Sequence, residues 1–365
     1  MKKLTHLAAV LSVTLASTYA LAEDKILNVY NWSDYIAEDT LANFEAETGI
    51  KVTYDVFDSN DVLEAKLLSG KTGYDVVVPT GTFLARQIKA GVFQTLDMSK
   101  LPNHKNLDPA IMKKLATLDP DNAHAIPYLW GTTGIGINVA KVQERLGEDY
   151  PLDSWDIVFK PEVAAKLADC GITMLDAYDE LVPTVLNYLG EDPKSQDVGL
   201  LNSKVTKVLQ AIRPYVRYFH SSQYINDLAN GDVCVSIGWS GDVLQAMDRA
   251  DEAENGVEVA YIIPKEGAGL WFDMLAIPKD ASNTENAHIF LNYLMRPDVM
   301  AGITNYVWYP NAIPSSKPSI DEEITSDPSI YPTPEVEEKL FTFPVYGPKY
   351  DRAGTRMWTA LKAGK

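Results

Sequence analysis

The chain has 365 residues, of which 46% are hydrophobic and 22% are charged, and its formal net charge is −18. This length fits two ordinary globular domains, and the apolar fraction is large enough for sizeable cores. An acidic surface repels nucleic acid and anionic membranes and so argues against both as partners, although the charge by itself says little about a ligand.

The N-terminus has the pattern of a secretory signal peptide. Lys2 and Lys3 precede an apolar run at 7–15, and Ala20-Leu21-Ala22 is a small-x-small cleavage pattern. The apolar run is too short to span a bilayer, which disfavours a membrane anchor. We therefore predict a signal peptide over 1–22, cleavage after Ala22, and export to the periplasm. Removal of the two lysines would change the net charge from −18 to −20.

Strands and helices alternate from the start of the mature chain. Strands are predicted at 26–32, 51–57 and 74–79, and helices at 40–48, 61–68 and 81–90, which end at Gly49, Gly70 and Gly91. Strand, helix and strand at this spacing indicate a parallel sheet.

A second α/β unit follows without a linker. It comprises strands at 135–139, 171–176 and 233–238 and helices at 179–189 and 242–252, before strands at 257–263 and 270–277 and a helix at 285–294. We expect the chain to cross between two lobes more than once, as in binding proteins that close about a hinge. One lobe is expected at 23–127 with about 252–302, and the other at 128–251 with about 303–365.

The two cysteines, Cys170 and Cys234, lie beside or within predicted strands. An even count in an exported protein favours one disulfide, and two buried free thiols are the alternative. Zinc is disfavoured because neither a CxxC nor an HxxxH pair accompanies them.

Polar and aromatic residues gather at predicted strand ends, where α/β folds place ligands. The segments are 32–35, 79–82, 176–180, 239–242, 271–273 and 309–311. A protonated amine needs carboxylates for its charge, and aromatic faces pack on its methylenes and attract the cation, at about 0.5–2 kcal/mol per contact. The combination favours an amine ligand. The alternative is that the aromatics are core residues and that Asp34, Asp58 and Asp242 are helix N-caps.

Several longer blocks resemble one family, the bacterial periplasmic polyamine-binding proteins that serve ABC importers as putrescine and spermidine receptors. The blocks are 31–36, 73–79, 127–131, 218–231, 263–268 and 355–358, so the resemblance covers nearly the whole mature chain. It implies an α/β type II periplasmic binding fold, with two lobes, a hinge and a ligand cleft between them. It also implies a monomeric receptor without cofactor or metal, which delivers a polyamine to an inner-membrane ABC permease.

The resemblance also implies a set of ligand-binding residues. The aromatic walls fall on Trp32, Tyr35, Trp239, Trp271 and Tyr309, the carboxylates on Asp34, Glu180, Asp242 and Asp273, and the polar contacts on Ser33 and Thr80. Family members commonly carry Ser where Thr80 stands, so the hydroxyl is kept and a methyl is added. The family's disulfide falls on Cys170 and Cys234.

Three alternatives remain open at this level. Glu180 and Asp242 could be the paired carboxylates of a glycoside hydrolase, although no G-x-S-x-G or H-E-x-x-H motif is present. Tyr215 and Tyr218 could hold iron, as in other receptors of this fold, and a sugar or peptide receptor is also compatible with the fold. Among polyamines, we expect spermidine to be preferred over putrescine, because Trp271 stands where many putrescine-preferring members carry Phe.

Overall fold

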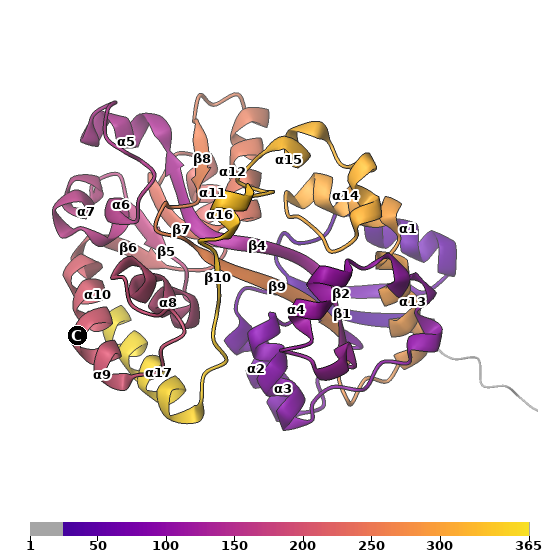
Figure 1. Ribbon diagram of the computed structural model, residues 1–365. Coiled ribbons are helices and arrows are strands. Elements are labelled where there is room, and N and C mark those ends of the chain that lie inside the picture. Colours follow the sequence, from indigo (N-terminus) through magenta and orange to yellow (C-terminus); the bar gives the residue numbers. More distant parts are fainter. Residues whose placement is uncertain (1–24, 365) are drawn as a thin grey trace, which may run out of the picture.

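The structure, a computed structural model, describes residues 25–364, and in this range ten strands form one mixed sheet (Figure 1). The strands are β1 (Ile26–Trp32), β2 (Lys51–Phe57), β3 (Val76–Val77), β4 (Ala125–Asn138), β5 (Ile172–Met174), β6 (Val216–Phe219), β7 (Val235–Trp239), β8 (Val259–Ile262), β9 (Gly269–Ala276) and β10 (Phe341–Thr342). Their order is β2-β1-β3-β9-β4-β7-β5-β6, with β10 paired to β9 and β8 to β4. β1 is parallel to β2 and β3, and β5 is parallel to β6 and β7, which confirms the predicted parallel pairing.

Helices cover both ends of this sheet (Figure 1). They are α1 (Glu38–Thr48), α2 (Asn60–Ser69), α3 (Gly81–Ala90), α4 (Pro109–Leu115), α5 (Val139–Leu146), α6 (Asp156–Phe159), α7 (Pro161–Leu167), α8 (Tyr178–Tyr188), α9 (Val198–Leu200), α10 (Thr206–Ile212), α11 (Gln223–Ala229), α12 (Ser240–Glu252), α13 (Thr284–Leu294), α14 (Pro297–Val307), α15 (Glu322–Ser326), α16 (Pro334–Glu337) and α17 (Pro348–Lys362). No helix in the described range is long and apolar enough to cross a membrane.

The buried hydrophobic side chains form two separate cores. The first core contains residues of β1, α1, β3, β9, α13 and α14, such as Phe44 of α1 and Phe290 of α13. The second core contains residues of β5, β7, α8, α12 and α17, such as Trp358 of α17, together with Trp155, which directly precedes α6. Trp239 packs against both, so the two cores meet at the end of β7.

The chain passes between the two cores several times. β4 begins beside first-core residues at Ala125 and ends beside second-core residues at Ile137, and the chain returns between β8 and β9. β4 pairs antiparallel with β7, β8 and β9, which joins the two parallel ends of the sheet. The predicted strand at 135–139 was too short, because Pro127 and the glycines of β4 interrupt the hydrophobic pattern. A side chain at Gly134 would meet Ile262 O and Tyr261 Oη at 2.5 Å, so the crossing requires glycine there.

Candidate ligand-binding site

A cavity of about 380 Å³ lies where the two cores meet. First-core elements supply part of its wall, from the end of β1, the N-terminus of α3, β9 and the segment after α14. Second-core elements supply the rest, from α8, the end of β7, the first turn of α12 and the segment after β6. The lining residues are Trp32, Ser33, Tyr35, Thr80, Glu180, Ser221, Trp239, Asp242, Trp271, Asp273 and Tyr309.

The aromatic residues form a continuous chain of ring contacts across this boundary. Trp239 lies edge-on to Trp32 with 5.4 Å between ring centroids, and 6.4 Å from Trp271. Trp271 lies 5.4 Å from Tyr309, which lies 5.2 Å from Tyr35. Four of these rings belong to the first core, and Trp239 packs against both cores. Such rings offer both an apolar surface and a negative face to a cation.

Asp242 is held by two tyrosine hydroxyls from different parts of the chain. Its carboxylate accepts from Tyr309 at 2.7 Å and from Tyr224 at 2.8 Å. The Tyr309 ring can reach this position because Gly241 has no side chain: a Cβ there would lie 2.4 Å from the ring. Asp242 is thus fixed in the first turn of α12 while the cavity stays open to its remaining lone pairs.

Glu180 and Asp273 are fixed in similar ways. Trp239 Nε1 donates to both oxygens of Glu180, at 3.1 and 3.2 Å, and the Thr133 hydroxyl donates to Glu180 as well. The Thr80 hydroxyl donates to Asp273 at 2.7 Å. The aromatic Trp239 therefore orients an acid at the same time as it forms part of the wall.

The three acids carry the electrostatics of the cavity. Glu180, Asp242 and Asp273 are 7%, 6% and 4% exposed. Burial is the main cause that raises the pKa of each acid to about 7. Repulsion from Asp273 adds to the rise at Glu180, and repulsion from Asp242 adds to the rise at Asp273. No Lys or Arg is among the described residues that line the cavity. Three buried acids without a Lys or Arg in the same described lining favour a ligand that carries positive charge.

The cavity brings together all but one of the predicted site residues, and Asp34 is the exception. Its backbone has a φ of 54°, and its carboxylate pairs with Arg249 Nη2 of α12 at 2.7 Å, outside the cavity lining. Sequence reasoning missed Ser221, which lines the cavity and whose hydroxyl accepts from the Asp176 backbone N–H at 3.1 Å. Ser221 lies within the resembling block 218–231, which was the only signal that pointed to it.

The N-cap alternative is wrong for all three aspartates. The N-cap of α2 is Ser59, whose hydroxyl accepts from the Val62 N–H, and not Asp58. Ala37 precedes α1, and Trp239 precedes α12. The carboxylates of Asp34 and Asp242 are engaged with Arg249 and with tyrosines instead.

The tyrosines considered for iron lie elsewhere. Tyr218 donates its hydroxyl proton to Asp227 at 2.6 Å, and neither Tyr215 nor Tyr218 lines the cavity. The described residues contain no group of three or more His, Cys, Asp or Glu placed to hold a metal ion. The site geometry therefore offers nothing in favour of the iron alternative.

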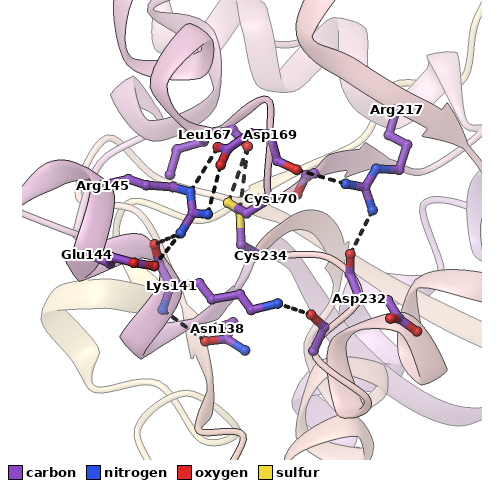
Figure 2. The surroundings of a disulfide bond; sticks show 12 residues. Asn138, Lys141, Glu144, Arg145, Leu167, Asp169, Cys170, Arg217, Asp232 and Cys234 are labelled. Atoms are coloured by element: carbon purple, nitrogen blue, oxygen red, sulfur yellow. Dashed lines mark hydrogen bonds and ion pairs between the residues drawn. A yellow bond between two sulfur atoms is a disulfide. The ribbon is translucent and has the colours of Figure 1, made fainter.

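Cys170 and Cys234 form a disulfide with 5.5 Å between their Cα atoms (Figure 2). Each cysteine lies just before one of the parallel strands β5 and β7, whereas the cavity residues follow the opposite ends of these strands. Around the bond, Arg145 binds both oxygens of Asp169, at 2.9 and 2.8 Å, and Arg217 donates to the Asp232 carbonyl at 2.7 Å (Figure 2). The disulfide thus joins two strands at the end of the second core that faces away from the cavity.

Comparison with known proteins assigns the chain to a family. A family model for bacterial extracellular solute-binding proteins matches residues 39–333. The chain belongs to this family. This solute-binding protein is 58% identical over 344 residues to the putrescine-binding periplasmic protein PotF of Escherichia coli, and this alignment covers 94% of this chain and 93% of PotF. It is 57% identical over 361 residues to the putrescine-binding periplasmic protein SpuD of Pseudomonas aeruginosa, and this alignment covers 99% of this chain and 98% of SpuD.

Solved structures agree with this assignment. A protein from Listeria monocytogenes described as a spermidine/putrescine ABC transporter superposes with a TM-score of 0.82 at 31% identity, over 93% of this chain and all of that chain. The predicted type II periplasmic binding fold and the resemblance to periplasmic polyamine-binding proteins are confirmed. These homologues are substrate-binding transport proteins, so the solute-binding protein is not a glycoside hydrolase.

Proposed function

We propose that this protein is a periplasmic receptor that captures a polyamine in the cavity between its two cores and delivers it to an ABC importer. The observation that carries the proposal is the group of three buried acids, Glu180, Asp242 and Asp273, in a cavity whose described lining lacks Lys and Arg. An alkylamine matches this cavity chemically, because its ammonium groups pair with the acids and its methylenes pack on indole and phenol rings.

Each ammonium group of a polyamine can contact an acid and an aromatic ring at the same time. Glu180 lies beside Trp239, Asp242 beside Tyr309, and Asp273 is paired with Thr80. Acids come from both cores, so a ligand with charge at both ends would draw the two cores together. This supports a closing motion about the segments that connect them, with the ligand replacing water around the acids.

Among polyamines we favour putrescine. PotF and SpuD, both named for putrescine, are 58% and 57% identical to this chain, whereas the protein described as a spermidine/putrescine transporter is 31% identical. These values do not support the spermidine preference expected from Trp271. Trp271 contacts the Trp239 and Tyr309 rings, and this bulky indole in the cavity wall limits the space beside the acids, which suits a short diamine.

We further propose the two cores as the two lobes. Their membership supports 25–129 with 270–313 as the first lobe and 135–262 with about 320–364 as the second. The exceptions are Phe341 and Phe343, which pack in the first core, and Ala301 and Trp308, which pack in the second. Export after cleavage at Ala22, residence in the periplasm and a monomeric state complete the proposal. Residues 1–24, which include the predicted signal peptide, lie outside the described residues.

Isothermal titration calorimetry of the purified mature protein tests the function. Putrescine, cadaverine, agmatine, spermidine and spermine are the ligands, and glucose and a tripeptide are controls. We expect saturable one-to-one binding of putrescine with a lower Kd than for spermidine, and no heat with the controls. Binding of a control but of no amine would refute the proposal, and tighter binding of spermidine would refute the choice of putrescine. The N-terminal sequence of protein purified from periplasm checks the cleavage site.

A further inference from the structure

A second, smaller cavity of about 260 Å³ adjoins the ligand cavity. The two cavities share four wall residues, Trp32, Glu180, Ser221 and Trp239. The other walls of the second cavity are strongly acidic and come from both cores, with Asp58 and Asp61 from one and Asp176 and Asp179 from the other. A polyamine longer than a diamine could extend into this space, so its electrostatics bear on ligand length.

Arg86 of α3 is a cation at the junction of the two cores, next to the second-cavity wall residues Asp61 and Phe83. Its Nε pairs with Glu64 at 2.6 Å, its Nη1 reaches Asp351 of α17 at 3.3 Å, and its Nη2 lies 4.0 Å from Asp61. The guanidinium carbon also lies 3.9 Å from the Phe83 ring centroid. Its side chain is 23% exposed, so solvent screens these pairs only in part.

The position of Arg86 is fixed from both sides. Gln87 donates to Glu64 at 3.2 Å, which orients the first-core partner of Arg86. The hydroxyl of Tyr178 donates to Asp351, so the second-core partner is anchored close in the chain to the cavity residue Glu180. A planar guanidinium held by two carboxylates and an aromatic ring is well ordered.

The neighbouring acids have different partners. Asp176 is paired with Lys362 at 2.7 Å, and Asp58 lies 3.7 Å from His220. Asp179 has no ion pair at this distance in the described range. Burial, then repulsion from Glu180 and Asp61, raises the pKa of Asp179, and Arg86 opposes this rise. Arg86 is therefore the guanidinium whose charge acts on both Asp61 and Asp179.

We propose that Arg86 is a specificity-determining residue that restricts the receptor to diamines, because its guanidinium supplies the positive charge that the third amine of a longer ligand would bring to the second cavity. Specificity of this kind arises from repulsion of the wrong ligand and not from contact with the right one. Arg86 is not among the described residues that line either cavity, so it acts through the acids around it. The inference rests on the proposed polyamine function and extends it to ligand length.

Calorimetry with putrescine and spermidine on wild type and Arg86→Gln tests the inference. We expect the ratio of spermidine affinity to putrescine affinity to rise at least tenfold in Arg86→Gln and to stay at the wild-type value in Arg86→Lys. Arg145→Gln is the matched control, because Arg145 is 21% exposed and binds the exposed Asp169 beside the disulfide, and neither residue lines either cavity. Its ratio should equal that of wild type.

A second variant keeps the test decisive if Arg86→Gln does not fold. Asp61 is 64% exposed, so Asp61→Asn should fold, and by leaving Arg86 less neutralised it should weaken spermidine more than putrescine. Equal changes for the two amines in Arg86→Gln or Asp61→Asn would overturn the inference while putrescine binding by wild type still stood. Wild type that bound neither amine would instead overturn the proposed function itself.

Discussion

The hydroxyl of Tyr309 donates to the Asp242 carboxylate at 2.7 Å and accepts from the Asp242 backbone N–H at 3.1 Å. This two-way contact joins a first-core residue to the first turn of α12 in the second core. One phenol thus orients a buried acid and links the two bodies that enclose the cavity.

Tyr309→Phe should weaken putrescine binding by about tenfold, because a hydrogen bond to a charged group contributes about 1.5–3 kcal/mol and part of this is recovered by water. Calorimetry measures the effect. Tyr306→Phe is the control, since Tyr306 donates to Glu38 at 3.2 Å on the surface and is 45% exposed. If both variants bind alike, the contact of Tyr309 with Asp242 does not contribute to affinity.

Asp242→Asn should raise the Kd for putrescine tenfold or more, since it removes a charge that pairs with an ammonium at a cost of roughly 1.5–3 kcal/mol. Asp34→Asn should raise it less than about fivefold, because a partly exposed ion pair contributes about 0–1 kcal/mol. The Asp34 and Arg249 side chains are 37% and 34% exposed. A larger loss in Asp34→Asn than in Asp242→Asn would reverse the assignment of Asp34 to the outside of the cavity.

The empty receptor should lose stability as pH rises from about 4 to 7. Glu180, Asp242 and Asp273 have pKa values raised to about 7 by burial, while their unfolded values lie near 4. Below about pH 4 these acids are protonated in both the folded and the unfolded state, so their raised pKa values do not change the free energy of unfolding. Between about pH 4 and 7 they ionise in the unfolded chain but not in the folded one, so the free energy of unfolding falls until the pH passes the folded pKa.

Ligand binding should show the opposite pH trend. Ammonium groups favour the ionised acids, so putrescine binding near pH 6 should release protons, and affinity should rise toward pH 8. Thermal unfolding with and without putrescine should give a larger ligand-induced increase in Tm at pH 8 than at pH 5.5. Calorimetry in buffers of different ionisation heat counts the protons. Affinity that fell between pH 5.5 and 8 would contradict ionised acids as ammonium partners.

Cys170→Ser with Cys234→Ser should lower the free energy of unfolding by about 2–5 kcal/mol and leave the Kd for putrescine within about twofold of wild type. The reason is that the bond lies at the opposite ends of β5 and β7 from the cavity. Urea unfolding and calorimetry check the two parts separately. Mass spectrometry of unreduced peptides from periplasmic protein should contain the linked pair, and two alkylated thiols would contradict it.

Local patterns in the sequence were sufficient to predict the α/β units and the strand ends that carry aromatic and acidic residues. β1, β2 and α3 fall at their predicted positions because period-two runs and terminal glycines are read within a few residues. The same patterns failed at β4, whose proline and glycines look like a turn, and at α14 and α17, which were not predicted. The placement of aromatic and polar residues near strand ends pointed to segments 271–273 and 309–311, and the resemblance to a family then assigned Trp271 and Tyr309 to the cavity wall.

The partners of these residues were decided only by the tertiary structure. Asp34 and Asp242 both follow a tryptophan closely in the sequence, yet Asp34 pairs with Arg249 outside the cavity while Asp242 is buried between two tyrosines. Arg86 reaches Asp351 across 265 residues, a contact that no local pattern records. Ion pairs, burial and raised pKa values arise from groups brought together when two cores pack, and this packing is a property of the whole chain.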